Sequence, residues 1–379
     1  MMIRVLSVFG TRPEAIKMAP VIRELQKYPE QVESRVCVTA QHRQMLDQVL
    51  DLFGIVPDID LDIMRPNQSL PDLTARVLLS MSDVLSQERP DIVLVQGDTT
   101  TVMATALAAF YQQIPVGHVE AGLRTYDRYA PFPEEINRRM AGVLATYHFA
   151  PTRTAVNALL SEGISRENIF LTGNTVVDAL LWVVNQPPSS FTRSLFTRLQ
   201  IPLHKSENDK KIILVTAHRR ENFGSPFEDL CRGIRLIADR NPNVHIVYPV
   251  HYNPNVREIA YRILEGHPRI HLLDPLPYEP FAHLMKAAYL ILTDSGGIQE
   301  EAPALGKPVL VLRDVTERPE AVEAGAVKVI GTDTQRVVEE TERLLHDENA
   351  YLSMAQSISP YGDGHAAERI VQIILTRMH

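Results

Sequence analysis

Residues Asp294–Glu301 read DSGGIQEE and directly follow the apolar run Ala287–Thr293. An apolar segment, then a polar residue and two glycines, then a helical pattern predicts a strand that turns into a helix. The first amides of a helix lack partners within it and carry partial positive charge. Because Gly296 and Gly297 have no Cβ, a phosphate can approach those amides, and Glu301 is a candidate acceptor for ribose hydroxyls. A tight turn without a ligand is the competing interpretation.

The same alternation of short apolar runs and helical patterns continues through most of the chain. Strands that are apolar throughout are typical of parallel sheets covered by helices, so the alternation predicts doubly wound α/β domains. We expect strands at Ile3–Phe9, Val32–Thr39, Ile92–Gln96, Val116–Val119, Tyr147–Ala150, Ile212–Thr216, Val244–Tyr248, Ile270–Leu273, Leu290–Thr293, Val309–Leu312 and Val327–Ile330. We expect helices at Pro13–Lys27, Met45–Leu52, Asp72–Gln87, Thr100–Gln112 and Phe227–Arg240.

The chain has 379 residues, more than one hydrophobic core usually serves, so two domains are expected. The alternation breaks between Gln186 and Lys211, and a boundary just before this stretch, near Gly173, gives two halves of similar size. The predicted domains are therefore residues 1–172 and 173–365. Residues 366–379 form a separate final helix.

Composition narrows the class of protein. A formal charge of −8 and a pI near 5.9 argue against a partner that is nucleic acid or an anionic membrane. We see no apolar run long enough to span a bilayer and no secretory signal. Cys37 and Cys231 are far apart in sequence, and we expect buried free thiols. These features predict a cytoplasmic protein, and no histidine or cysteine cluster has the spacing of a metal site.

Charged residues follow several predicted strands of the first half, at the sheet edge where α/β proteins bind ligands. Arg12 and Lys17 lie in GTRPEAIK after the first strand, Asp98 in QGDTTT, Glu120 in HVEAGLR and Glu134 in PFPEEINR. Each has a structural alternative: a solvated charged face, a helix cap, or acids that complement a helix dipole. Three carboxylates at one edge nevertheless favour a site.

In the second half, His218 ends a strand in TAHRREN and is a candidate general acid or base, because its ordinary pKa lies near neutrality. A structural histidine is the alternative. Arg318, in TERPEAV, is a candidate ligand for phosphate or ribose oxygens, and His251 is a weaker candidate. The chain has neither the glycine fingerprint of dinucleotide-binding folds nor a P-loop.

Together these motifs resemble the non-hydrolysing UDP-N-acetylglucosamine 2-epimerases of bacteria. The resemblance runs in order from Val5 to about Gly364 through FGTRPEAIKMAP, TAQHRQMLDQVL, QGDTTT, HVEAGLRT, PFPEEINR, GNTVVDAL, TAHRREN, TDSGGIQEEAP and TERPEAV. It implies two Rossmann-like domains in the GT-B architecture with a deep interdomain cleft, a final helix that returns to the first domain, and a homodimer. It also implies interconversion of UDP-N-acetylglucosamine and UDP-N-acetylmannosamine, which supplies units for a surface polysaccharide, with no cofactor.

The resemblance further implies a mechanism in which UDP is eliminated to leave 2-acetamidoglucal and then adds back. It assigns catalysis to Asp98, Glu120, Glu134 and His218. It assigns UDP-sugar contacts to Arg12, Lys17, Phe281, Ser295, Gly296, Gly297, Glu301 and Arg318. A second substrate molecule acts as activator in some members, at residues corresponding to Gln41, Gln44, Arg219 and His251. The alternative functions are a hydrolysing epimerase, a GT-B glycosyltransferase and a binding protein without turnover.

Overall fold

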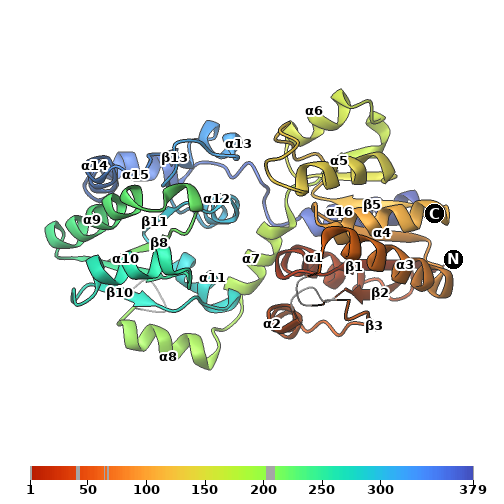
Figure 1. Cartoon of the computed structure of the whole chain (residues 1–379), viewed down its shortest axis with the longest axis horizontal. Coiled ribbons are helices and arrows are strands. Elements are labelled where there is room, and N and C mark those ends of the chain that lie inside the picture. Colours follow the sequence, from red (N-terminus) through yellow and green to blue (C-terminus); the bar gives the residue numbers. More distant parts are fainter. Residues whose placement is uncertain (1, 40–42, 64, 66–67, 202–209, 379) are drawn as a thin grey trace. The chain divides into compact units, whose positions relative to one another are not determined.

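The computed structural model describes residues 2–39, 43–63, 65, 68–201 and 210–378, and the chain divides into two compact units. Unit 1 comprises Met1–Ala179 and Tyr361–His379, and unit 2 comprises Leu180–Pro360. Each unit has one parallel sheet with helices packed on it (Figure 1). No helix in this described part of the chain is long and apolar enough to cross a bilayer.

Unit 1 contains a seven-stranded sheet in the order β3-β2-β1-β4-β5-β6-β7, and all its pairings are parallel. The strands are β1 (Ile3–Phe9), β2 (Val32–Val38), β3 (Ile59–Asp60), β4 (Ile92–Gln96), β5 (Val116–Val119), β6 (Tyr147–Ala150) and β7 (Ile169–Leu171). The helices are α1 (Arg12–Leu25), α2 (Arg43–Phe53), α3 (Leu70–Glu88), α4 (Thr100–Tyr111), α5 (Glu134–Leu144), α6 (Arg153–Ser161), α7 (Thr175–Asn185), which continues into unit 2, and α16 (Ala366–Arg377).

Unit 2 contains a six-stranded parallel sheet in the order β10-β9-β8-β11-β12-β13. Its strands are β8 (Lys211–Thr216), β9 (Val244–Pro249), β10 (Ile270–Leu273), β11 (Leu290–Thr293), β12 (Val309–Val311) and β13 (Val327–Val329). Its helices are α8 (Ser190–Leu199), α9 (Ser225–Arg240), α10 (Pro254–Leu264), α11 (Tyr278–Ala287), α12 (Gly296–Glu301), α13 (Pro319–Glu323), α14 (Thr334–His346) and α15 (Glu348–Ala355).

Both strand orders reverse direction at one point: between β1 and β4 in unit 1, and between β8 and β11 in unit 2. This is the doubly wound Rossmann order, in which ligands bind outside the carboxyl ends of the two strands at the reversal. The predicted fold class, two Rossmann-like α/β domains, is confirmed. The segments that follow those strands are therefore the expected positions of ligand-binding residues.

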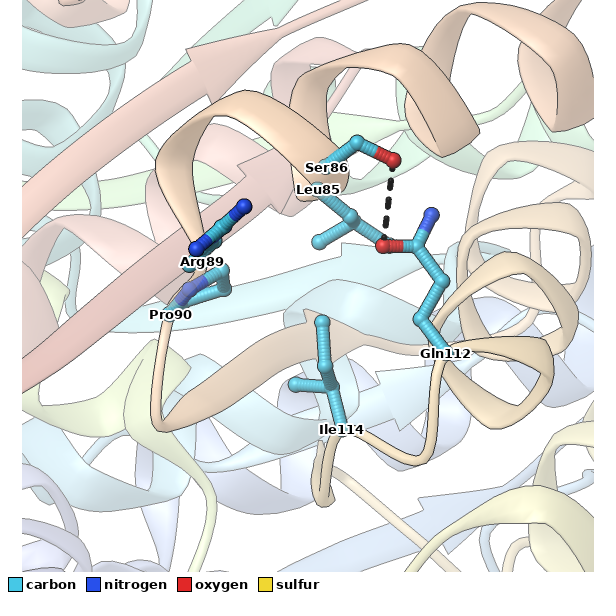
Figure 2. Close-up of a pocket in the computed structure, with 6 residues that line it drawn as sticks. All are labelled: Leu85, Ser86, Arg89, Pro90, Gln112 and Ile114. Carbon is cyan, nitrogen blue, oxygen red and sulfur yellow. Dashed lines mark hydrogen bonds between the residues drawn. The ribbon is translucent and has the colours of Figure 1, made fainter.

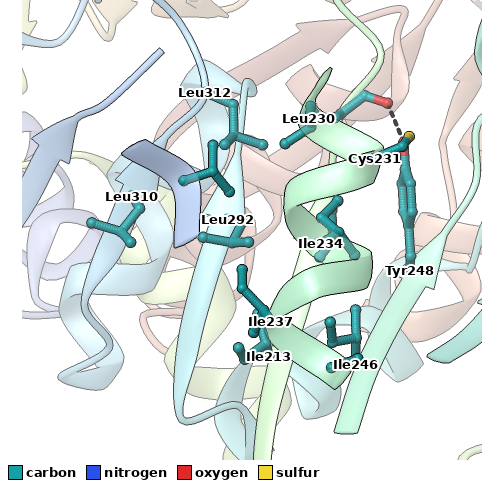
Figure 3. Packing of buried hydrophobic residues seen from close by; sticks show 14 of the residues in the cluster. Ile213, Leu230, Cys231, Ile234, Ile237, Ile246, Tyr248, Leu292, Leu310 and Leu312 are labelled. Carbon is teal, nitrogen blue, oxygen red and sulfur yellow. Dashed lines mark hydrogen bonds between the residues drawn. The ribbon is translucent and has the colours of Figure 1, made fainter. Parts of the chain in front are cut away.

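The core of unit 2 lies between its sheet and the helices that cover it. Helix α9 turns Ile234 and Ile237 toward Ile213 and Leu292 on the central strands, and all four side chains are fully buried (Figure 3). Burying such a side chain contributes about 1.5–3 kcal/mol, so this face holds α9 on the sheet. The packing fixes β8 and β11 side by side and thus sets the positions of the turns that follow them.

The final helix α16 belongs to unit 1. Its first turn is held by Asp178 of α7, whose Oδ1 accepts a hydrogen bond from the Ala367 amide at 2.8 Å. Burial raises the pKa of Asp178 to about 6. Further along, Gln372 Nε2 donates to the Tyr28 hydroxyl at 2.7 Å, just beyond the end of α1. These two contacts, one at the start of α16 and one near its middle, hold the helix on unit 1.

Two histidines are buried in the sheet of unit 1. His118 on β5 and His148 on β6 are register partners, and each is 1% exposed. His118 Nε2 donates to the carbonyl oxygen of Gly97 at 2.7 Å. Burial is the main cause that lowers the pKa of His118 to about 4 and the pKa of His148 to about 3. Both rings are therefore neutral in the folded protein at ordinary pH.

Because these two histidines are neutral in the folded protein, we expect acid to lower the free energy of unfolding. In the unfolded chain their pKa is about 6.5, so below that pH the unfolded state binds protons that the folded state does not. Their contribution to the free energy of unfolding is complete above about pH 6.5 and is lost as pH falls through about 4 and then about 3, a loss of several kcal/mol. Urea unfolding between pH 4 and 7.5 should show His148→Gln with a shallower pH slope than the unmodified protein. His365→Gln, at an exposed position, is the control and should keep the slope. An unchanged slope in His148→Gln would contradict the expectation.

Candidate active site

The first group of site residues surrounds Glu14, at the carboxyl edge of the unit 1 sheet. Glu14 is 2% exposed, and its Oε2 accepts hydrogen bonds from the amides of Gly10 at 3.0 Å and Thr11 at 2.7 Å. Its Oε1 accepts from the Thr99 hydroxyl at 2.6 Å. Burial raises the pKa of Glu14. The buried carboxyl thus ties together the turns after β1 and β4, the two strands at the reversal, and so fixes the segment that carries Arg12.

Gly10 is required by the close approach of these segments, because a Cβ there would lie 2.1 Å from the Thr39 hydroxyl oxygen. Arg12, two residues on, is half-buried and makes no hydrogen bond or ion pair with the described residues. A guanidinium held in a fixed turn without a partner is suited to bind an anion.

Glu120 lies at the carboxyl end of β5 in an uncommon backbone conformation, with φ of 65°. Such a conformation costs a non-glycine residue roughly 1–2 kcal/mol and is frequent at functional sites. The carboxylate is buried and accepts hydrogen bonds from Lys17 Nζ, Gln96 Nε2 and Asn174 Nδ2, the last at 2.9 Å. An ammonium and two amides therefore stabilise the ionised form of Glu120 and fix its direction.

Asp98, in the turn after β4, is paired with Arg138 of α5, whose Nη2 lies 2.5 Å from Asp98 Oδ2. The Arg138 Nη1 atom also lies 3.5 Å from Glu135 Oε2, and Glu135 is fully buried. Glu135 accepts a hydrogen bond from the Thr125 amide at 3.0 Å and so holds the loop before α5. Its neighbour Glu134 is half-buried, and no described residue donates a hydrogen bond to it. The two acids of this helix turn thus differ: Glu135 anchors structure, and Glu134 is available to a ligand.

In unit 2, Asp294 joins the two strands at the reversal. Its Oδ2 accepts hydrogen bonds from the amides of His218 and Arg219, both at 2.7 Å, while its own amide donates to the Thr216 carbonyl oxygen at 3.1 Å. Asp294 is fully buried and directly precedes Ser295. The segments that carry His218 and the paired glycines are therefore held together by one carboxylate.

His218 lies between two other ionisable side chains. Its Nδ1 is 3.7 Å from Asp294 Oδ1, and its ring stacks on the ring of His251 with a centroid distance of 5.2 Å. Burial lowers the pKa of His218, Asp294 opposes the shift, and His251 and Arg219 add to it. A mainly neutral imidazole near pH 7 is suited to accept a proton.

Arg318 lies over the turn at the start of α12. Its Cζ would be 3.7 Å from a Cβ placed on Gly296, and its Nε donates to Glu300 Oε1 at 2.5 Å. The Ser295 hydroxyl does not cap the helix, although Ser295 occupies the N-cap position. The Ser295 amide donates to the Thr293 hydroxyl at 2.9 Å, so the amides beside the guanidinium that no described residue engages are those of Gly296 and Gly297. Such a combination favours phosphate oxygens.

Glu301 is 7% exposed and lies at the end of α12. Its Oε1 accepts a hydrogen bond from the Tyr278 hydroxyl at 2.8 Å, which links it to the start of α11. Phe281 is half-buried and follows Tyr278 by three positions on the same helix, so the two side chains project from neighbouring positions on one face. The hydrogen bond from Tyr278 thus connects Glu301 of α12 to the helix that carries Phe281.

Two of the four predicted activator contacts are Gln41 and Gln44. Gln41 lies outside the described residues, and of Gln44 only its place in α2 is described. Arg219 and His251 are brought to His218, as stated above. The residues that sequence reasoning passed over are Glu14, Gln96, Arg138, Asn174, Asp294 and Glu300. All of them stand inside or beside the quoted motifs, but only the folded contacts reveal what they hold.

The described residues contain no group of three or more His, Cys, Asp or Glu side chains that would hold a metal ion. A shallow pocket of about 370 Å³ lies at the opposite, amino edge of the unit 1 sheet (Figure 2). It is lined by Leu85, Ser86, Arg89, Pro90, Gln112 and Ile114 and contains none of the predicted site residues.

Comparison with known proteins gives concordant results. The family model described as UDP-N-acetylglucosamine 2-epimerase matches residues 23–375. A UDP-N-acetylglucosamine 2-epimerase of Escherichia coli O157:H7 is 59% identical over 371 residues, which cover 98% of each chain. The crystal structure of the UDP-GlcNAc 2-epimerase of Neisseria meningitidis bound to UDP-GlcNAc is 51% identical, with a TM-score of 0.88, over 99% of this chain and 100% of that one. The crystal structure of a putative UDP-N-acetylglucosamine 2-epimerase from Listeria monocytogenes is 50% identical, with a TM-score of 0.92, over 100% of this chain and 97% of that one.

Doubly wound units with charged groups at the carboxyl edges of their sheets define an α/β protein of the Rossmann-like class. The sequence comparisons are more specific than the fold. The chain belongs to the UDP-N-acetylglucosamine 2-epimerase family.

Proposed function

We propose that this protein interconverts UDP-N-acetylglucosamine and UDP-N-acetylmannosamine without net hydrolysis. The observation that carries the proposal is family membership, with a relative named UDP-N-acetylglucosamine 2-epimerase at 59% identity over 98% of the chain. The hydrogen at C2 of this sugar is not next to a carbonyl group, so direct deprotonation is very unfavourable. Elimination of UDP across C1–C2 avoids that step, and re-addition with the proton delivered to the other face completes the epimerisation.

The roles of the acids follow from their surroundings. Glu120, ionised beside Lys17, is proposed to stabilise the positive charge that develops on the sugar ring as UDP leaves. Asp98, Glu134 and His218 are proposed to move protons, since each offers an oxygen or nitrogen that is partly accessible.

We propose that the amides of Gly296 and Gly297, with Arg318, bind the diphosphate and stabilise it as it departs. Support comes from the guanidinium that lies over the Gly296 turn. Arg12 and Lys17 are proposed to add positive charge to the substrate site, Lys17 while it holds Glu120. Glu301 is proposed to accept hydrogen bonds from the ribose, and Phe281 to contact the uracil ring.

Product analysis in heavy water tests the function. The protein is incubated with UDP-N-acetylglucosamine and the sugars are followed by NMR. We expect both epimers to appear as UDP-sugars with deuterium at C2. Stoichiometric free N-acetylmannosamine and UDP would instead identify a hydrolase. Intact substrate without deuterium would refute epimerisation and leave a transferase or a binding protein.

A ribose contact by Glu301 predicts a large loss of nucleotide affinity in Glu301→Ala. Removing hydrogen bonds to a carboxylate costs about 1.5–3 kcal/mol, so UDP should bind roughly 10- to 100-fold more weakly by calorimetry. Tyr278→Phe is the matched control, because it removes the hydroxyl that donates to Glu301 and keeps the carboxylate and the aromatic ring. Equal losses in both variants would show that Glu301 acts by packing and not by contact with the nucleotide.

We also propose a cytoplasmic homodimer that supplies mannosamine units for a surface polysaccharide. Cys37 and Cys231 are buried free thiols, as suits a reducing compartment. A dimer is supported by large apolar side chains that are exposed on α3, α4 and α5, where α4 packs against both of the other helices. These side chains are Leu79, Phe110, Tyr111, Met140 and Val143. Light scattering should give twice the 42.6 kDa chain mass, and a monomer at micromolar concentration would contradict this.

Activation by a second substrate molecule at Gln41, Gln44, Arg219 and His251 is a further proposal. Its test uses the reverse reaction, started from UDP-N-acetylmannosamine alone. If activation operates, turnover should show a lag that a trace of UDP-N-acetylglucosamine abolishes. A reaction without a lag would contradict it.

A further inference from the structure

Asp294 has one oxygen engaged and one available. Oδ2 accepts both backbone hydrogen bonds, from His218 and Arg219. Oδ1 is buried and no described residue donates a hydrogen bond to it, while Nδ1 of His218 lies 3.7 Å away. Burying a carboxylate oxygen without a hydrogen bond costs free energy. The position of this oxygen near the imidazole therefore indicates that it interacts with His218 during function.

The distance of 3.7 Å is longer than a hydrogen bond. Catalytic hydrogen bonds are often long before the substrate binds. Rotation of the imidazole about its side-chain bonds would bring Nδ1 closer to Oδ1. The His218 side chain is 40% exposed, so it has room to rotate, whereas Asp294 is fully buried and fixed by its backbone contacts. The carboxylate is thus the stationary partner and the imidazole the mobile one.

We propose that Asp294 is a positioning residue for His218: its free oxygen holds Nδ1 in the protonated form and leaves Nε2 as the proton acceptor. This rests on the proposed epimerase function, in which His218 exchanges a proton with the substrate. When Nε2 takes that proton, the resulting imidazolium has Nδ1–H facing a carboxylate, which stabilises its positive charge. Because Asp294 directly precedes Ser295, its carboxylate also connects His218 to the glycine turn.

The groups that face His218 act in opposite senses. Burial, His251 and Arg219 lower the pKa of His218, and Asp294 raises it. Replacing the carboxylate by an amide should therefore lower the pKa of His218 further and move the acid limb of the rate profile to lower pH.

Asp294→Asn separates positioning from simple anchoring. The amide oxygen still accepts both backbone hydrogen bonds, so an anchor alone would be preserved, but the NH2 group then faces Nδ1 and favours the wrong tautomer. We expect turnover to fall by about 10²–10⁴-fold, the range of a lost general base, with UDP affinity and thermal stability within about 2-fold and a few degrees. In a His218→Ala background the same change should cost little, because the two residues act as a unit.

Nitrogen NMR of histidine-labelled protein, assigned with His218→Ala, reads the tautomer without any turnover. We expect Nδ1–H in the unmodified protein and a shift toward Nε2–H in Asp294→Asn. Wild-type turnover in Asp294→Asn, an equal loss in the His218→Ala background, or Nε2–H in the unmodified protein would overturn the proposal. Should the unmodified protein fail to epimerise, the proposed function fails, and the NMR result alone still decides the His218–Asp294 relation.

Discussion

Asp98→Asn is expected to reduce kcat by about 10²–10⁴-fold while leaving UDP affinity nearly unchanged. The amide oxygen can still accept the hydrogen bond from Arg138 Nη2, which lies 2.5 Å from Asp98 Oδ2, so the turn after β4 should keep its shape. What is lost is the negative charge and the ability to carry a proton. Turnover is measured by NMR of the two epimers, and affinity by calorimetry with UDP.

The matched control is Asp91→Asn, the same change just before the other end of β4. Asp91 accepts a hydrogen bond from the Arg4 amide at 2.7 Å, at the amino edge of the sheet and away from the predicted site residues. Its kcat should stay within about 2-fold of the unmodified protein. Full turnover with weakened binding in Asp98→Asn would mean that Asp98 binds substrate and does not take part in the chemistry.

Glu120→Gln is expected to lower both activity and stability. Lys17, Gln96 and Asn174 all donate to the buried carboxylate, so an amide leaves the ammonium without its counter-charge and brings NH2 against another donor. Breaking a buried ion pair from one side costs about 3–5 kcal/mol, and the loss of charge near the sugar should reduce kcat by about 10²-fold or more. Urea unfolding and NMR turnover assays measure the two effects.

The double variant Lys17→Met, Glu120→Gln tests whether the loss of stability comes from breaking the ion pair. It removes both charges, so it should be more stable than Glu120→Gln alone while remaining inactive. If the double variant were less stable by the sum of the single changes, the ion pair would not be the source of the loss.

The sequence predicted the sheets well because their strands are apolar throughout and their helices carry clear caps. Helix α1 begins at Arg12, one residue before the predicted start, because Thr11 caps it in a capping box with Glu14. Strands β3 and β7 were missed, since two and three residues give no periodicity to detect. The division into units falls within α7, between Ala179 and Leu180, while the pattern alone suggested a boundary near Gly173. A helix that continues across a division leaves no break in the pattern.

The candidate site was predicted as a set of residues but not as a set of contacts. Lys17 and Glu120 are 103 positions apart, and His218 and Asp294 are 76 apart, so their pairing depends on strand order and turn geometry. Glu134 and Glu135 are adjacent and chemically alike, and only burial separates the anchor from the residue open to a ligand. Strand-end position therefore predicts which residues belong to the site, and the folded contacts show which partners each of these side chains has.

The central claim is that the bond between the sugar and UDP breaks and re-forms during epimerisation. Positional isotope exchange tests it with UDP-N-acetylglucosamine that carries oxygen-18 in the bridge between C1 and the β-phosphate. Once UDP is free in the site, rotation of the β-phosphate makes its oxygens equivalent. The account predicts that label moves from the bridge to the non-bridging positions at least as fast as the epimer forms. Epimerisation with the label retained in the bridge would contradict it.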